Sequence, residues 1–136
     1  MLSTSVSVTA QCYSCMAKTL GSLWKDAGLD EIFIEPEAFT DLCKRPEKNR
    51  QIMFARPCTS VCVSMLIELS FGMGAKTHIR GCYDTIFLHG FNELASSRLK
   101  SREVCQRFNI SQLARRRPMV FIANEKILFC FATVIV

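Results

Sequence analysis

Apolar and polar residues alternate most clearly between Cys58 and Leu69, in the run CTSVCVSMLIEL. Every second residue in this run is apolar, as expected for a strand with one buried face. The apolar residues of that face are Val61, Val63, Met65 and Ile67. A second run of this kind, Lys76–Tyr83, follows the glycine-containing turn Phe71–Gly74, so the two runs are predicted to form a β-hairpin.

The remaining pattern predicts short elements separated by polar loops. A strand is expected at 11–16, one or two helical turns at 20–27 around Trp24, and an exposed loop at 44–51. A last hairpin is expected from 118–123 and 127–134. The uncharged stretch 127–136 is too short to cross a bilayer as a helix, which takes about 20 residues. Its Val, Ile, Phe and Thr content favours a strand over a targeting signal.

The N-terminal segment MLSTSVSVTA carries no charge and ends on small residues, as the cleavage site of a signal peptide does. A complete secretory signal also has a charged start and an apolar stretch of about 7–15 residues. We interpret residues 1–10 as the remnant of a signal peptide and residues 11–136 as a single domain. The alternative for residues 1–10 is a disordered N-terminus.

Eight cysteines change this picture most, since their even number and wide spread are typical of a disulfide framework. They are Cys12, Cys15, Cys43, Cys58, Cys62, Cys82, Cys105 and Cys130. Disulfides persist outside the cytosol, so this interpretation predicts an extracellular protein. Spacing alone does not choose among the pairings.

Two other interpretations of the cysteines stay open. A tetrahedral zinc site could use Cys12, Cys15, Cys58 and Cys62, which would make the chain an intracellular interaction module. This alternative leaves four cysteines unexplained. A redox pair at Cys12 and Cys15 would need a helix starting between the two cysteines, and the pattern predicts none there.

Several segments, taken in order, carry a resemblance to a known family. They are Cys12–Met16 (CYSCM), Trp24, Phe39–Cys43 (FTDLC), Pro57–Met65 (PCTSVCVSM), Ile79–Cys82 (IRGC), Gly90–Asn92 (GFN) and Cys105. Together they resemble the lymphocyte-antigen-six/urokinase-receptor (LU) domain, and most closely its nematode-type branch. The resemblance covers 11–105 and, more weakly, 127–131.

The resemblance implies a small, disulfide-rich, all-β three-finger fold, with one or two short helices in the loops. It implies disulfides that join Cys12 to Cys62, Cys15 to Cys43, and Cys58 to Cys82. Members of the family are secreted or held on the outer face of the plasma membrane by a glycolipid anchor. They are not enzymes, take no cofactor, and bind receptors, channels or other extracellular proteins.

The C-terminal end departs from the family pattern, because its closing cysteine cluster is incomplete and only Cys130 remains. One interpretation pairs Cys130 with Cys105. The other leaves both cysteines unpaired. The Cys-Asn ending that normally precedes an anchor signal is also missing, so the sequence does not itself predict anchorage.

The chain shows few other candidates for chemistry. His78 and His89 have no neighbouring motif that suggests a catalytic triad, and no phosphate loop or nucleic-acid pattern is present. The net charge of +5 is mild and favours an acidic partner or an anionic membrane surface only weakly.

Contacts with a protein partner are predicted at the loop tips. Phe71 and Met73 flank a glycine turn, while Arg45 and Arg50 bound the polar loop. Phe87 is predicted to join the core instead. Asn109, in Asn-Ile-Ser, is the predicted N-glycosylation acceptor.

Overall fold

The computed structural model describes residues 10–46, 55–68, 76–93, 105–114 and 126–132. The strands are β1 (Ala10–Tyr13), β2 (Cys15–Met16), β3 (Ala38–Phe39), β4 (Ala55–Cys58), β5 (Cys62–Glu68), β6 (Lys76–Cys82), β7 (Gln106–Asn109) and β8 (Lys126–Ala132). The helices are α1 (Lys18–Ser22) and α3 (Ile110–Leu113), with the 3-10 helices η1 (Leu29–Glu31) and η2 (Asp41–Lys44). The predicted signal-peptide remnant lies outside the described residues, apart from its last residue.

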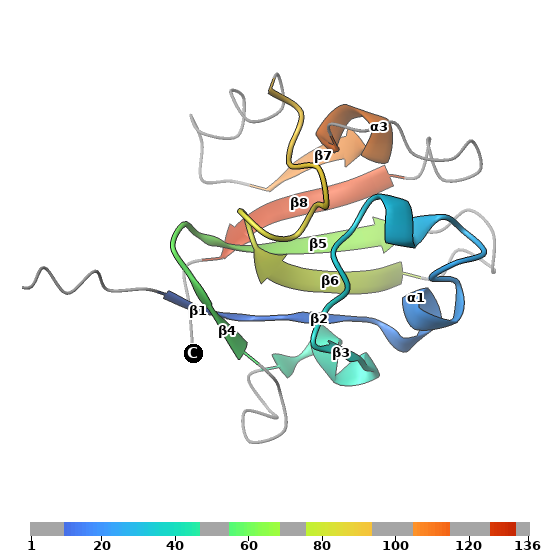
Figure 1. Cartoon of the computed structure of the whole chain (residues 1–136), viewed down its shortest axis with the longest axis horizontal. Coiled ribbons are helices and arrows are strands. Elements are labelled where there is room, and N and C mark those ends of the chain that lie inside the picture. The colour runs from blue at the N-terminus through green and yellow to red at the C-terminus, as the bar shows by residue number, and fades with distance from the viewer. Residues whose placement is uncertain (1–9, 47–54, 69–75, 94–104, 115–125, 133–136) are drawn as a thin grey trace, which may run out of the picture.

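Two sheets organise the chain (Figure 1). One has six strands in the order β3-β2-β6-β5-β8-β7, and β1 and β4 form a two-stranded ladder. Neighbouring strands are antiparallel, except for β2 and β3. The predicted hairpin is confirmed, since all of β5 pairs with all of β6 at the centre of the larger sheet.

The run predicted as one strand from Cys58 to Leu69 is two strands. β4 ends at Cys58 and pairs with β1, whereas β5 begins at Cys62 and pairs with β6. The turn between them is held where the Tyr83 amide donates to the Val61 carbonyl at 2.9 Å. Because the chain changes direction here, Val61 leaves the apolar face predicted for it and is 43% exposed.

The predicted last hairpin is wrong in its partner. The strand expected at 127–134 is present as β8, but β8 lies between β5 and β7. β5 pairs with β8 along its whole length and β7 pairs with its first four residues, where the expected hairpin would begin, and 118–123 lie outside the described residues. Pairing with the central β5 buries Ile127 completely, which a terminal hairpin would not do.

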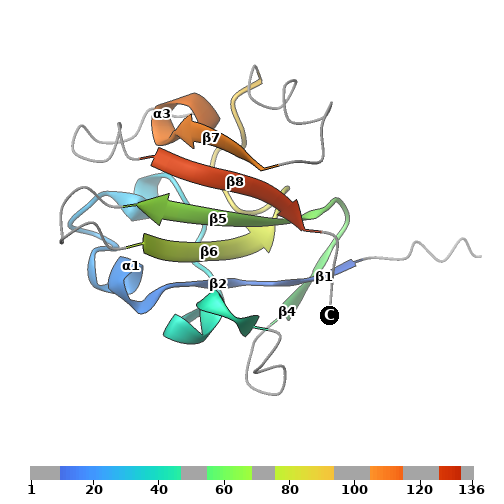
Figure 2. The same cartoon turned by 180° about the vertical axis from the view of Figure 1, so that it is seen from behind.

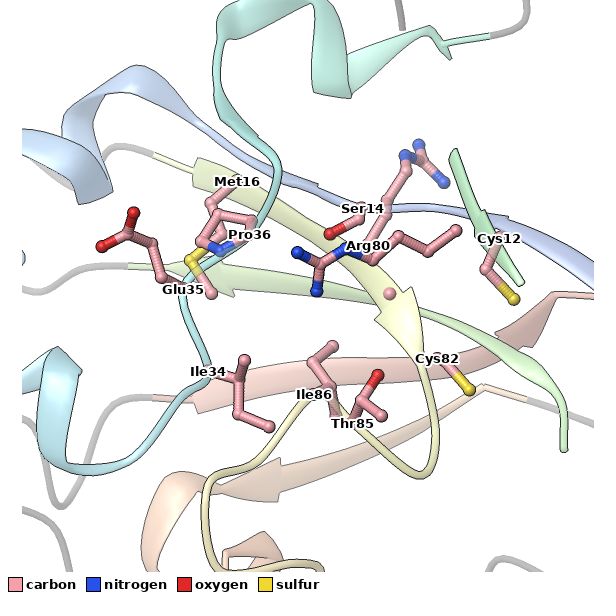
Figure 3. A pocket seen from close by; sticks show the side chains of 12 residues that line it. Cys12, Ser14, Met16, Ile34, Glu35, Pro36, Arg80, Cys82, Thr85 and Ile86 are labelled. Atoms are coloured by element: carbon pink, nitrogen blue, oxygen red, sulfur yellow. The ribbon is translucent and has the colours of Figure 1, made fainter. Parts of the chain in front are cut away.

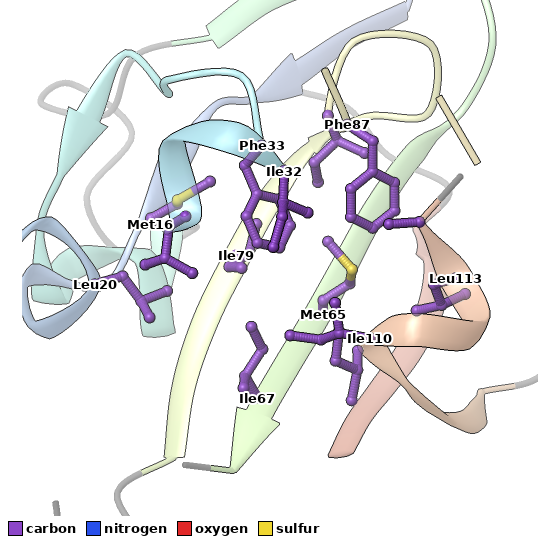
Figure 4. Close-up of a cluster of buried hydrophobic side chains, with 14 of the residues drawn as sticks. Met16, Leu20, Ile32, Phe33, Met65, Ile67, Ile79, Phe87, Ile110 and Leu113 are labelled. Carbon is purple, nitrogen blue, oxygen red and sulfur yellow. The ribbon is translucent and has the colours of Figure 1, made fainter. Parts of the chain in front are cut away.

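The hydrophobic core lies on one side of the larger sheet, which we call the packed face. Its sheet residues include several that are at most 1% exposed: Met16, Val63, Met65, Ile67, Ile79 and Ile127. The segment from α1 to η1, the stretch after β6 and helix α3 cover them (Figures 1 and 4). Phe33 and Phe87 stack there with ring centroids 5.1 Å apart, so Phe87 is a core residue, as predicted. Each buried side chain of this size contributes about 1.5–3 kcal/mol.

Three excursions of the chain leave a common base. The first runs from β1 to β4 and contains α1, the second joins β5 to β6, and the third runs from β6 to β8 and contains α3. This is a small, disulfide-rich, all-β, three-finger-like fold with short helices in its loops, as predicted. The strands β2 and β3 of the first excursion also extend the sheet beside β6.

Candidate functional site

Four disulfides hold the three excursions, two of them at the common base and one each within the first and the third excursion. They join Cys12 to Cys62, Cys15 to Cys43, Cys58 to Cys82, and Cys105 to Cys130. The first three pairs coincide with those that the family resemblance implies. The fourth is the pair for which the sequence left two alternatives. It links the residue before β7 to β8, so the third excursion is closed as well.

Two of the disulfides form a buried cluster at the base. Cys12, Cys58, Cys62 and Cys82 are each at most 7% exposed and pack against one another. The Ser60 hydroxyl lies 3.5 Å from the sulfur atoms of both Cys58 and Cys82. These two bridges, with sequence separations of 50 and 24, connect the β1–β4 ladder to the central hairpin. Bridges that close loops of this size stabilise a domain by about 3–4 kcal/mol each.

The pairing rules out the zinc alternative. Its four proposed ligands, Cys12, Cys15, Cys58 and Cys62, are all bound in disulfides and offer no thiolate. Among the described residues, no group of three or more His, Cys, Asp or Glu side chains could hold a metal ion. The redox-pair interpretation is also wrong, because Cys12 and Cys15 each bind a different partner.

Arg80 fastens η2 to the sheet, which the sequence analysis missed. Its guanidinium group donates to the carbonyls of Cys43 and Lys44, at 2.6 and 3.2 Å, and to the Ser64 hydroxyl at 3.3 Å. The Thr40 hydroxyl caps the start of η2 by accepting from the Leu42 amide. A charged residue between Ile79 and Gly81 in a strand was the signal that could have revealed this role.

The predicted contact residues fall in different parts of the chain. Arg45 follows η2 and is exposed, with its amide donating to the Leu42 carbonyl at 3.0 Å. Phe71, Met73 and Arg50 lie outside the described residues. The structure therefore provides a position for Arg45 alone, and the loop-tip contacts remain predictions.

Asn109, the predicted glycosylation acceptor, stands at the end of β7 and directly before α3. It is half-buried, and its backbone N–H donates to the Gln112 side-chain oxygen at 2.8 Å. Its register partner is Lys126 of β8. The side chain thus belongs to the sheet side opposite the packed face.

His78 lies on β6, half-exposed and opposite Leu66. Burial lowers the pKa of its imidazole below the ordinary value of 6.5, and the charges of Arg80 and Lys44 lower it further. The ring is therefore neutral at physiological pH, and the nearby positive charges are those of Arg80 and Lys44.

A small hollow lies beside β2 and β6 (Figure 3). Ile34 and Ile86 line one side of it, and Ser14 and Met16 line the other. Its polar groups already serve the fold. The Ser14 hydroxyl accepts from the Glu37 amide at 3.1 Å, and Arg56 forms an ion pair with the Glu37 carboxylate. This arrangement holds the first excursion in place and brings no nucleophile together with a base.

The disulfides, the three excursions and the order of strands can be compared with known families. The model of the Caenorhabditis elegans ly-6-related protein family matches residues 15–133. The chain belongs to the Ly-6-related family. No curated protein and no solved structure matched it.

Membership of the Ly-6-related family agrees with the disulfide-rich character of the domain. Members of this family are typically extracellular or surface domains, and they are generally not enzymes. Among the described residues, no helix is both long enough and apolar enough to span a membrane.

Proposed function

We propose that this Ly-6-related chain is an extracellular binding protein, secreted or anchored to the outer face of the plasma membrane. It has no enzymatic activity, and it engages a receptor, a channel or another protein through its loop tips. The observation that carries the proposal is the set of four disulfides, two of which join the bases of the excursions while the other two close the first and the third. Disulfides of this kind persist in oxidising compartments, which supports an extracellular location.

The binding role follows from the way the loops are held. The disulfides restrict the conformations of each excursion before any partner arrives, so less entropy is lost when the loops dock. Arg80 adds to this restriction by holding η2, which ends next to Arg45. In this proposal the contacts come from Phe71 and Met73 in the second excursion, and from Arg45 and Arg50 in the first.

The proposal also includes a glycan on Asn109. The Asn-Ile-Ser sequence lies at a strand end next to the short helix α3 and is partly accessible, as a glycosylation acceptor must be. Treatment of the secreted protein with an amide-cleaving glycosidase should lower its mass by one glycan. Asn109→Gln should abolish that change in mass without preventing secretion.

The first experiment measures the intact mass of the protein secreted from cultured cells, after thiol alkylation with and without prior reduction. We expect no label before reduction and a label on each of the eight cysteines afterwards. Labelling without reduction would contradict an extracellular disulfide-bonded domain.

The second experiment tests partner binding. The oxidised protein, made multivalent, is applied to an array of receptor and channel ectodomains, with reduced and alkylated protein as its control. We expect binding by the oxidised form alone. The variant Phe71→Ala/Met73→Ala should weaken it, whereas Lys25→Ala, an exposed change between α1 and η1, should not. Equal binding by the loop-tip variant and the parent would contradict the proposed contacts.

A further inference from the structure

Among the described residues, no layer covers most of one side of the larger sheet, although η2 lies against that side at Arg80. Residues of β5 and β6 alternate between burial on the packed face and partial exposure on the other side, which we call the open face. Its residues include Ser64, Leu66, Glu68, Lys76, His78, Arg80, Arg107 and Leu128, and the proposed glycan acceptor Asn109 lies at its edge, at the end of β7. Figure 2, seen from this side, shows β5, β6 and β8 with no other ribbon in front of most of their length.

Charge on the open face is mostly positive. Lys76 and Arg107 are exposed on β6 and β7, Arg80 is half-exposed, and Lys44 of η2 is exposed nearby. Glu68, opposite Lys76, is the one acidic residue among those that define the face. Since His78 is neutral at physiological pH, the excess of positive charge comes from lysine and arginine.

An apolar pair occupies the middle of this charged surface. Leu66 pairs in register with Leu128 on one side and with His78 on the other, and Leu128 pairs with Arg107. Both leucines are half-exposed. One row across four strands therefore reads histidine, leucine, leucine, arginine. An apolar centre with a polar, charged rim is the usual composition of a protein-binding surface.

We infer that the open face is a second docking surface, which binds an acidic protein surface with an apolar centre. The inference rests on the proposed role as a binding protein, but it assigns contacts to the sheet and not to the loop tips. The acidic groups of the partner would oppose Lys76 and Arg107, and its apolar groups would cover Leu66 and Leu128. Complementary charge of this kind speeds association and selects the partner.

Two other occupants fit the surface less well. A second copy of the chain docked face to face would bring like charges together. A lipid headgroup or a nucleic acid would meet the Glu68 carboxylate and would gain little from the two leucines. The combination of one carboxylate, several cations and an apolar pair favours a protein.

The test uses the secreted, oxidised protein labelled for NMR and a short synthetic peptide with acidic residues around a leucine and valine centre. A second peptide carries serine in place of the apolar residues, and a third carries lysine in place of the acidic ones. We expect only the first to shift amide signals along β5, β6, β7 and β8. Arg107→Glu and Leu66→Thr should each weaken its binding, Arg107→Glu by about tenfold.

Lys25→Glu is the matched control, because Lys25 is equally exposed but lies between α1 and η1, in the segment that covers the packed face. It should bind like the parent. Equal loss with Lys25→Glu, or amide shifts confined to other elements, would overturn the inference. One more outcome would overturn the inference. In it, the parent protein binds vesicles of phosphatidylserine and phosphatidylcholine, Arg107→Glu abolishes this binding, and the acidic peptide does not bind.

The same variants separate this inference from the proposed function. If an ectodomain from the array binds the parent, loss with Arg107→Glu but not with Phe71→Ala/Met73→Ala supports the open face. Loss with the loop-tip variant alone overturns the inference and leaves the proposed function intact. If no ectodomain binds, the proposed function fails, and the peptide titration still decides whether the open face binds acidic protein surfaces.

Discussion

The two sides of the six-stranded sheet are stabilised by different means. The packed face buries Val63, Met65 and Ile67 of β5 under helices and loops. Among the described residues, the open face has no such layer over Leu66 and Leu128, although η2 covers it at Arg80, and each of the four disulfides has a cysteine on that side. These cysteines are Cys15, Cys62, Cys82 and Cys130, which register pairing links to the same side as Arg80 and Ser64.

This difference shows how a small domain can leave one sheet surface free for contacts. On the packed face, burial of apolar area stabilises the fold, which requires that the face be covered. On the open face, covalent bridges at the margins restrict the unfolded chain and need no apolar layer over the middle of the sheet. The bridged cysteines lie in two adjacent rows at one end of this face, and the surface beyond them then stays accessible to a partner.

Removal of one bridge should have the largest effect. Cys82→Ser opens the disulfide to Cys58 and leaves a buried thiol, so we expect the free energy of unfolding to fall by about 4 kcal/mol. Secretion yield should fall sharply with it. Urea unfolding and the yield of secreted protein measure these effects, with Cys58→Ser/Cys82→Ser as the control that removes the unpaired thiol. Unchanged stability and yield in both variants would contradict a structural role for this bridge.

Substitutions of two neighbouring residues allow the two faces to be compared directly. Met65 is fully buried on the packed face and Leu66 is half-exposed on the open face. We expect Met65→Ala to lower the free energy of unfolding by about 3 kcal/mol, because it leaves a cavity in the core. Leu66→Ala should cost about 1 kcal/mol or less. Chemical denaturation of both variants measures the contrast, and similar losses would mean that the open face is covered in solution.

A smaller effect is expected in the segment that covers the packed face. Gly90 has φ of +82°, and a Cβ atom placed there would meet no other atom within 4 Å. Gly90→Ala therefore adds backbone strain without a clash, and should lower the free energy of unfolding by about 1–2 kcal/mol. Thermal unfolding measures the loss. Gly90→Asn, which tolerates this conformation better, should lose less, and equal losses would argue against strain as the cause.

The smallest effect concerns His78 on the open face. Because its folded pKa lies below the ordinary 6.5, the unfolded chain takes up a proton more readily than the folded one. This contribution to stability is complete above pH 6.5 and is lost as the pH falls through that value toward the lower, folded pKa. Urea unfolding at about pH 7.5 and about pH 5.5 measures the change, which His78→Gln should reduce. An equal pH dependence in the variant would assign the effect to other groups.

Much of the fold could be predicted because the strongest signals are local. The alternating run Cys58–Leu69 and the run Lys76–Tyr83 beyond a glycine turn predicted the central hairpin, since the strand period of two determines which side chains share a face. The order of the cysteines and of the motifs around them was enough to recognise the family, and the family in turn implied the three-finger architecture. The ends of strands were harder, because the turn before Cys62 arises from pairing with distant strands and not from the local pattern.

The sequence by itself determined which residues of each strand share a side, and that the chain carries a disulfide framework. The tertiary structure alone decided that β8 enters the sheet between β5 and β7, because β8 gains two partners only after the chain has folded back over long distances. It likewise decided that Arg80 holds η2 and that one face stays open. Periodicity identifies the apolar side of a strand, but only the packing of the whole chain determines whether the other side is covered.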